Sequence, residues 1–123
     1  MPRKKILLVD DSSTILMTER MILGGESYDL VTATDGQEAV EKAVKERPDL
    51  ILMDVLMPRM TGIEACRRIR QIDATRSIPI IMVITPGETR TIEAALGSGC
   101  SDYVTKPIAG VELLSKLKAH LGE

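Results

Sequence analysis

The stretch KILLVDDSS, residues 5–13, runs a short aliphatic segment directly into two adjacent carboxylates. Residues 6–9 are all branched aliphatic residues, a pattern typical of a buried strand. Asp10 and Asp11 follow without a break. Two like charges about 4 Å apart repel by roughly 4 kcal/mol at an effective dielectric near 20. Adjacent acids at the end of a core strand therefore need water or a cation beside them.

The composition is that of one ordinary globular domain. The chain has 123 residues, 44% of them hydrophobic, and a formal net charge of −2. This length and apolar content suffice for one hydrophobic core. We therefore expect a single domain over residues 1–123, with no linker and no output domain after it.

Charge and hydropathy exclude two classes of partner. Nucleic-acid binding relies on clustered positive charge, and the chain has no Lys/Arg stripe, so we expect no nucleic-acid partner. No apolar run approaches the roughly 20 residues of a membrane span, and no signal peptide is evident. We expect no membrane association and a cytoplasmic location.

Short apolar runs alternate with longer amphipathic segments, which indicates strands and helices in a parallel sheet. The runs predict five strands, at residues 5–9, 29–33, 50–53, 79–84 and 102–105. Apolar residues at helical spacing predict helices between or after them, at residues 36–47, 61–72 and 110–123. The residues expected on their buried faces are Ala39, Val40, Ala43, Val44, Ala65, Cys66, Ile69, Ile72, Leu114, Leu117 and Leu121.

Capping signals agree with these helix boundaries. Asp35 with Glu38, and Thr61 with Glu64, each place an oxygen acceptor and an acid three residues apart at a helix start. Gly122 is expected to end the last helix.

The alternation predicts a doubly wound sheet with helices on both faces, because crossovers between parallel strands are almost always right-handed. Ligands of such sheets bind beyond the carboxyl ends of the strands, at the switch point. The strand ends carry Asp10, Asp11, Asp54 and Lys106. If the first and third strands are neighbours, three carboxylates converge on a pocket that suits Mg²⁺, and Lys106 suits a phosphoryl oxygen. The pattern indicates phosphoryl chemistry.

Each of these residues also has a plain structural interpretation. Asp11 or Ser12 can cap the first helix, Asp54 can open a turn, and Lys106 can be a solvated surface lysine. Their joint occurrence at carboxyl ends of strands in one sheet favours the functional interpretation of the set.

Three segments carry a family resemblance: ILLVDDS at residues 6–12, DLILMDVLMPRMTG at residues 49–62, and DYVTKPI at residues 102–108. In this order and spacing they resemble the receiver domain of two-component response regulators, of the chemotaxis-type, single-domain kind. The resemblance implies a flavodoxin-like fold with strand order 2-1-3-4-5. It implies a signalling domain and not an enzyme, with promotion only of its own phosphorylation and dephosphorylation.

The resemblance also assigns the site. Asp54 is the expected phosphoacceptor, taking its phosphoryl group from a phosphohistidine on a histidine kinase or histidine phosphotransfer protein. Asp11, Asp54 and the backbone carbonyl of Leu56 are the expected ligands of Mg²⁺, while Asp10 acts through water. Lys106 is expected to contact the phosphoryl group.

The remaining expectations of the resemblance concern the switch. Lys106 and Pro107 are expected to share a cis peptide bond. Tyr103 is the ring expected to reorient on the output face, formed by the fourth helix, fifth strand and fifth helix, where a separate output protein would bind. Leu56 and Pro86 stand at the positions that govern the lifetime of the aspartyl phosphate, and neither side chain offers a hydrogen bond, so we expect slow self-dephosphorylation.

One position departs from the family pattern. Ile84 occupies the place usually filled by Thr or Ser, and it has no hydroxyl to donate to a phosphoryl oxygen. Thr85 is a possible substitute, although successive strand residues face opposite ways and residues 85–88 read as a capping box with Pro86 first in the helix. We therefore expect weakened coupling to Tyr103.

Two other functions compete with the phosphorylated receiver. A receiver-like interaction module could switch weakly or without phosphorylation, as the Ile84 departure suggests. A Mg²⁺-dependent hydrolase could also form an aspartyl phosphate. That class needs a second acid two residues after the nucleophile, where this chain has Leu56.

Overall fold

A computed structural model describes residues 3–87 and 89–123. Within them, five strands stand within one residue of their predicted bounds. They are β1 (Lys4–Val9), β2 (Tyr28–Ala33), β3 (Leu50–Asp54), β4 (Ile80–Ile84) and β5 (Asp102–Thr105). All residues of β3 and β4 are buried, as expected for strands covered on both faces.

The strands form one parallel sheet in the order β2-β1-β3-β4-β5, which confirms the predicted topology. β1 lies between β2 and β3, with Val9 opposite both Ala33 and Met53. The carboxyl ends of β1 and β3 are therefore neighbours, which is the condition for the predicted convergence of the acids.

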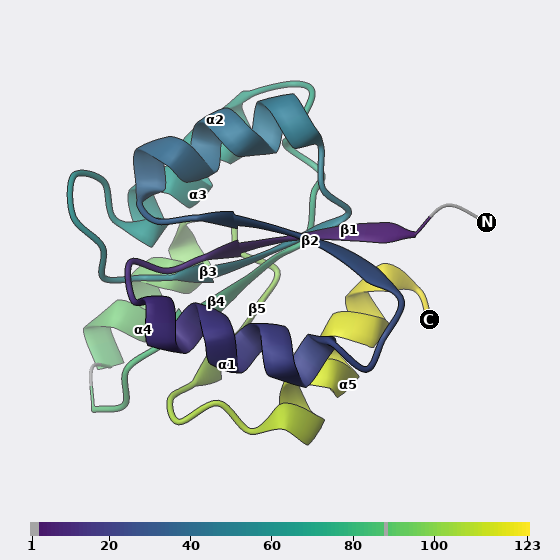
Figure 1. Ribbon diagram of the computed structural model, residues 1–123. Coiled ribbons are helices and arrows are strands. Elements are labelled where there is room, and N and C mark those ends of the chain that lie inside the picture. The colour runs from purple at the N-terminus through teal and green to yellow at the C-terminus, as the bar shows by residue number, and fades with distance from the viewer. Residues whose placement is uncertain (1–2, 88) are drawn as a thin grey trace.

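Helices cover both faces of the sheet (Figure 1). They are α1 (Ser13–Leu23), α2 (Gly36–Glu46), α3 (Gly62–Gln71), α4 (Thr89–Gly97) and α5 (Gly110–Leu121). Buried residues of α2, α3 and α4 pack in one hydrophobic cluster, and those of α1 and α5 pack in a second cluster on the other face. The predicted layers are therefore confirmed.

The helix boundaries follow local hydrogen bonding. Asp35 and Thr61 accept hydrogen bonds from the backbone N–H groups of Glu38 and Glu64 respectively, so both predicted caps are confirmed. Gly122 ends α5 in the left-handed conformation, with φ 75°.

The predicted start of α4 is wrong. Gly87 has φ 94°, a left-handed conformation that cannot continue a right-handed helix, and α4 begins at Thr89. Pro86 therefore lies in a turn before the helix. Glu88, the acid of the predicted capping box, lies outside the described residues.

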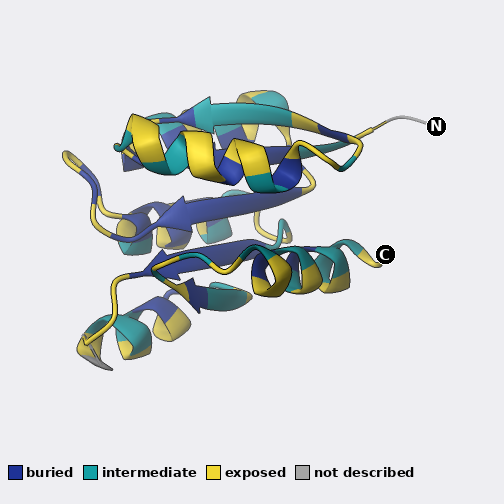
Figure 2. Cartoon of the chain, turned by 60° about the horizontal axis from the view of Figure 1, so that its bottom comes forward, coloured by how far each residue is buried: buried dark blue, intermediate teal, exposed yellow. Residues whose placement is uncertain are grey.

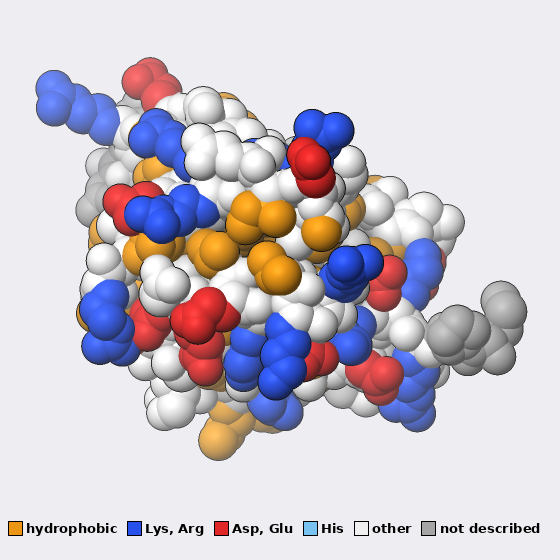
Figure 3. Space-filling view, turned by 90° about the horizontal axis from the view of Figure 1, so that it is seen from above, with side chains coloured by type: hydrophobic (Ala, Val, Ile, Leu, Met, Phe, Trp, Pro, Cys, Tyr) orange, Lys and Arg blue, Asp and Glu red, His pale blue; other side chains and the backbone are white. Residues whose placement is uncertain are grey.

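The buried colour follows the inner strands β1, β3 and β4 and the inner helix faces, whereas the edge strands β2 and β5 are mostly intermediate and the outer helix faces are exposed (Figure 2). The predicted stripes need two adjustments. Val44 is 42% exposed, because it lies at the outer margin of α2. Other hydrophobic side chains also reach the surface on the side of the molecule formed by α2 and α3 (Figure 3). In α5, Leu113 and Leu117 are fully buried, while Leu114 and Leu121 are only partly buried.

Among the described helices, none combines the length and apolar character that crossing a membrane requires.

Candidate functional site

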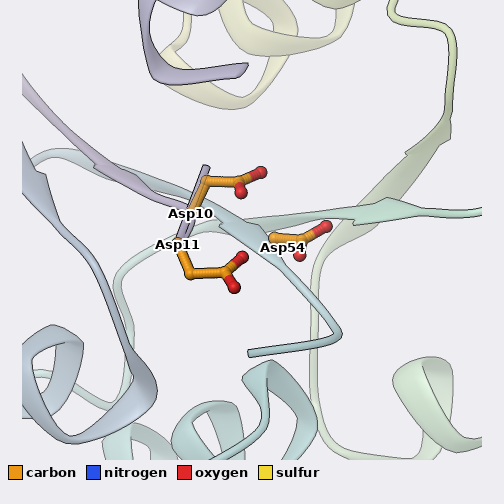
Figure 4. A group of neighbouring side chains, drawn as sticks. All are labelled: Asp10, Asp11 and Asp54. Atoms are coloured by element: carbon orange, nitrogen blue, oxygen red, sulfur yellow. The ribbon is translucent and has the colours of Figure 1, made fainter. Parts of the chain in front are cut away.

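The structure brings three carboxylates together at the carboxyl edge of the sheet. Asp10 and Asp11 follow β1 directly, and Asp54 is the last residue of β3. Each offers an oxygen, and these oxygens lie within 4.8 Å of one another. The three side chains gather in one small region (Figure 4). The convergence follows from strand pairing, since Val9 and Met53, the residues before Asp10 and Asp54, are partners.

Two of the three acids are buried. Asp10 is 1% exposed and Asp54 is 4% exposed, whereas Asp11 lies at the surface. Burial, opposed by a hydrogen bond from the Ser12 backbone, raises the pKa of Asp10 to about 6. Burial also raises the pKa of Asp54, against the effect of Lys106. A buried carboxylate loses the hydration that stabilises its negative charge. A positive charge nearby can replace that stabilisation, so the site favours a cation.

Lys106 supplies one such charge. Its Nζ lies 3.1 Å from Asp54 Oδ1 and 3.9 Å from Asp10 Oδ2. Partial burial works to lower the pKa of Lys106, but its hydrogen bond and charge attraction to Asp54 raise it overall. The backbone N–H of Lys106 donates to the Ile84 carbonyl at 2.9 Å, and the Lys106–Pro107 peptide bond is cis.

The donor set fits a hard divalent cation. Asp10 Oδ1 accepts from the Ser12 backbone at 2.9 Å, but its buried Oδ2 has no hydrogen-bond partner among the described residues. Carboxylate oxygens are the ligands that Mg²⁺ prefers, and Mg²⁺ commonly keeps several waters. The orphaned oxygen and the clustered acids are therefore suited to Mg²⁺, bound directly or through water.

The loop between β3 and α3 packs tightly against the phosphoacceptor candidate. A Cβ on Gly62 would lie 2.1 Å from the Asp54 carbonyl oxygen, so only glycine allows this approach. The Gly62 N–H donates to the Val55 carbonyl at 2.8 Å. Met57 and Met60 anchor the loop in the core, while Leu56 is 56% exposed.

The predicted switch residues lie along β4 and β5. Ile84 is fully buried in the core, and Thr85 follows it as an exposed residue. Tyr103 lies at the margin of the same core cluster. Lys116 Nζ lies 5.4 Å from the centroid of the Tyr103 ring and donates to the Tyr103 carbonyl at 2.7 Å. Thr85, whose hydroxyl is the one nearest to Ile84 in sequence, therefore lies outside the core that buries Ile84.

Glu19 was not predicted as a site residue, but its side chain is buried on α1, close enough to Asp10 and Asp54 to feel their charges. It is 1% exposed, and neither carboxyl oxygen has a hydrogen-bond partner among the described residues. Burial first, and the charges of Asp10 and Asp54 second, raise its pKa to about 8. The signal was available, because Glu19 stands three residues after Leu16 and four before Leu23 on the inward stripe of α1.

A second missed feature is the ion pair of Arg59 with Asp35. Arg59 Nη2 lies 2.7 Å from Asp35 Oδ2. The two residues are 24 positions apart, so neither capping nor helix periodicity indicates the pair.

Comparison with known proteins gives one consistent result. Residues 6–118 match the family model described as response regulator receiver domain. The chain is 41% identical over 118 residues to the alkaline phosphatase synthesis transcriptional regulatory protein PhoP of Bacillus subtilis (strain 168), a match that covers 96% of this chain and 48% of PhoP. It is also 41% identical over 117 residues to the transcriptional regulatory protein ResD of that organism, covering 95% of this chain and 48% of ResD. The chain thus spans about half the length of these relatives.

Solved structures show the same similarity. The receiver domain of the sensor histidine kinase PA1611 from Pseudomonas aeruginosa PAO1 has a TM-score of 0.92 at 32% identity, covering 99% of this chain and 100% of that one. That structure has a magnesium ion coordinated in its active site cleft. Chemotaxis protein CheY4 of Vibrio cholerae has a TM-score of 0.88 at 34% identity, covering 96% and 98% of the two chains.

Proposed function

Because this chain belongs to the response regulator receiver domain family, which has a phosphoacceptor role in two-component signalling, we propose that its acceptor is Asp54. The observation that carries the assignment is the placement of Asp54 between Lys106, 3.1 Å away, and the carboxylates of Asp10 and Asp11. The donor in this proposal is a phosphohistidine on a histidine kinase or histidine phosphotransfer protein.

The proposed transfer exchanges one bond at phosphorus for another. A carboxylate oxygen of Asp54 attacks the phosphorus atom, and an O–P bond forms while the P–N bond to the donor imidazole breaks. The electron pair of that bond returns to the imidazole nitrogen, which takes a proton from solvent. Lys106 favours the carboxylate form of Asp54 before transfer and neutralises a phosphoryl oxygen after it.

Mg²⁺ is the proposed cofactor. Asp11, Asp54 and the backbone carbonyl of Leu56 would hold it directly, and Asp10 would hold it through water. When bound, the ion neutralises charge on the phosphoryl oxygens. The orphaned Oδ2 of Asp10 supports this assignment, because a buried acceptor without a partner is costly.

In this proposal the domain signals by binding and is not an enzyme acting on other substrates. Leu56 stands where an aspartyl-phosphate hydrolase needs its acid, and an alkyl side chain cannot transfer a proton. The output face would be formed by α4, β5 and α5 and would contact a separate protein. That the chain acts as a single domain, without nucleic acid and in the cytoplasm, stays a prediction.

A second candidate function is a weakly switching interaction module, which the position of Ile84 favours. The side chain is apolar and fully buried, so it offers no hydrogen bond to a phosphoryl oxygen. In this case Asp54 is still phosphorylated, while the response of Tyr103 is reduced.

The test of the acceptor is intact-mass spectrometry after incubation with acetyl phosphate and Mg²⁺. The expected result is one added phosphoryl group, absent in Asp54→Asn and retained in Asp73→Asn, which changes an exposed aspartate outside the site. Added mass that persists in Asp54→Asn would contradict the assignment. Thermal melts should also show stabilisation by Mg²⁺, since a ligand of the folded state adds stability by mass action. Coincident melts would count against the metal site.

A further inference from the structure

The turn that opens α2 contributes no acid to the three-carboxylate cluster, yet it is hydrogen-bonded to the segments that follow β1 and β3, the two strands whose ends carry the acids. The backbone N–H of Asp10 donates to the Ala33 carbonyl at 3.1 Å. Three residues further on, the backbone N–H of Gly36 donates to the Met60 carbonyl at 3.2 Å. The turn at residues 33–36 therefore links the loop after β1 to the loop after β3.

An ion pair strengthens the second of these links. Asp35 Oδ2 accepts from Arg59 Nη2 at 2.7 Å and from Arg59 Nε at 3.1 Å. The other oxygen of Asp35 accepts from the Glu38 N–H at 2.7 Å, which caps α2. These bonds lower the pKa of Asp35, the bond from Glu38 first and the contact with Arg59 after it. The Asp35 side chain is 10% exposed and the Arg59 side chain 71% exposed, so the pair is shielded from solvent on the carboxylate side only.

The path of the β3–α3 loop depends on these contacts. Arg59 has φ 67°, a left-handed conformation that residues other than glycine, asparagine and aspartate rarely adopt. A Cβ on Gly36 would lie 2.3 Å from the Met60 carbonyl oxygen, so the two backbones touch with no room for a side chain. A loop in an unfavoured conformation needs external restraint.

We propose that Asp35 and Arg59 are positioning residues for Mg²⁺, holding the loop that carries Leu56 at the spacing from Asp10 and Asp11 that a small octahedral ion requires. The inference rests on the proposed function, because Leu56 is a metal ligand only there. Arg59 touches no reacting group in this proposal and acts through the loop.

Simple electrostatics makes the opposite prediction, which allows a sharp test. Removing the positive charge of Arg59 from the surroundings of a cation site strengthens cation binding if charge alone matters. If Arg59 instead positions the loop, its removal weakens cation binding. Mg²⁺ requires near-ideal geometry at about 2.1 Å, whereas Ca²⁺ accepts flexible geometry at about 2.4 Å, so a displaced loop penalises Mg²⁺ more than Ca²⁺.

The test measures Mg²⁺ and Ca²⁺ dissociation constants by NMR titration of the backbone amides of residues 54–57. Arg59→Asn suits the left-handed backbone and removes the guanidinium. The expected result is Mg²⁺ binding weaker by about tenfold, with a smaller loss for Ca²⁺. Asp35→Asn keeps the cap acceptor, and the double variant should bind Mg²⁺ no more weakly than the weaker single variant, because both changes break one contact. Arg59→Lys should fall between parent and Arg59→Asn.

Arg76→Asn is the matched control, because the exposed side chains of Arg76 and Asp73 pair at 3.5 Å between α3 and β4, at the amino ends of the strands and away from the acids. Its Mg²⁺ affinity should equal that of the parent. Melts in EDTA establish that each variant is folded during titration. Mg²⁺ binding in Arg59→Asn that is unchanged, tighter, or weakened equally with Ca²⁺ would overturn the positioning role. Because these titrations use the metal alone, they are independent of whether acetyl phosphate modifies Asp54.

Discussion

Lys106 lies closer to Asp54 than to Asp10: its Nζ is 3.1 Å from Asp54 Oδ1 and 3.9 Å from Asp10 Oδ2. The lysine therefore leaves Asp10 Oδ2, an oxygen of the most buried acid of the three-carboxylate cluster, without a hydrogen bond, while it neutralises the proposed acceptor. The lysine pairs with Asp54 and Asp10, two of the three carboxylates of the cluster. This asymmetry supports separate roles for the lysine and the proposed metal, and it leads to the first prediction.

Replacing Lys106 with Met should change metal binding and phosphorylation in opposite directions. Without the lysine, the acids attract a cation more strongly, so Mg²⁺ affinity should rise by about tenfold. Phosphorylation by acetyl phosphate should slow by about tenfold or more, because the charge-assisted contact to the phosphoryl group is lost. NMR titration and intact-mass time courses measure the two effects, with Lys45→Met on the exposed side of α2 as the control. A parallel fall in both would indicate general damage to the site.

Glu19 should make the folded protein less stable as the pH rises. Its pKa is about 8 in the folded protein, against an ordinary value of 4.5, so the folded state holds the proton more tightly. Protonated Glu19 therefore contributes to the free energy of unfolding. This contribution is complete below about pH 4.5 and is lost as the pH rises through 8, with a slope of up to about 1.4 kcal/mol per pH unit. Asp10, with a pKa of about 6, adds a smaller effect of the same sign.

Urea unfolding in EDTA at several pH values between 5 and 8.5 measures this dependence. Glu19→Gln removes the titrating group at nearly constant size, and the free energy of unfolding should then fall less steeply with pH. Glu41→Gln changes an exposed glutamate on α2 and should retain the slope of the parent. Parallel curves for the parent and Glu19→Gln would exclude the assigned protonation state.

Gly62→Ala should destabilise the protein and displace Asp54, the proposed acceptor. The added Cβ meets the Asp54 carbonyl oxygen at 2.1 Å, and backbone must move to admit it. The expected cost is about 1–3 kcal/mol in the free energy of unfolding, with weaker Mg²⁺ binding. Gly97→Ala is the matched control, because a Cβ there meets nothing within 4 Å and alanine favours the helix by up to about 1 kcal/mol. Equal stability of the two variants would contradict the packing argument.

Leu56→Asn should shorten the lifetime of the aspartyl phosphate. The Leu56 side chain is exposed beside the acceptor loop and offers no hydrogen bond to an attacking water. An amide can orient that water, and we expect decay faster by about tenfold, below the gain from full acid–base catalysis. Mass spectrometry after removal of acetyl phosphate follows the decay. An unchanged half-life would show that water orientation at this position does not limit hydrolysis.

Ile84→Thr should restore the coupling between phosphorylation and Tyr103. The new hydroxyl can donate to a phosphoryl oxygen, a contact worth about 1.5–3 kcal/mol when charge-assisted. NMR shift changes of Tyr103 and α4 upon addition of a phosphoryl mimic with Mg²⁺ should be larger than in the parent. If the parent already responds fully and Thr85→Ala abolishes that response, Thr85 is the switch residue and the hypothesis is wrong.

Local patterns were enough to predict the sheet and the acids. Apolar runs of four to six residues marked the strands, and the order of strands followed from the resemblance and from right-handed crossovers. Asp10, Asp11, Asp54 and Lys106 stand at strand ends, where parallel pairing brings them together. These features depend on residues that are neighbours in sequence or on the regular pairing of strands. Both can be inferred from a sequence pattern.

Tertiary packing decided the features that set the energetics of the site, even where the sequence pattern, as for Glu19 on the inward stripe of α1, carried a signal. The start of α4 moved because Gly87 adopts φ 94°, which composition does not specify. Asp35 and Arg59 are 24 residues apart, and their ion pair joins two loops. The carboxyl group of Glu19 loses its hydration only when α1 packs against the sheet. Hydration and the distance between charges decide the pKa of a group and its affinity for metal. Both quantities are properties of the packed structure, because in the unfolded chain every one of these side chains is surrounded by water.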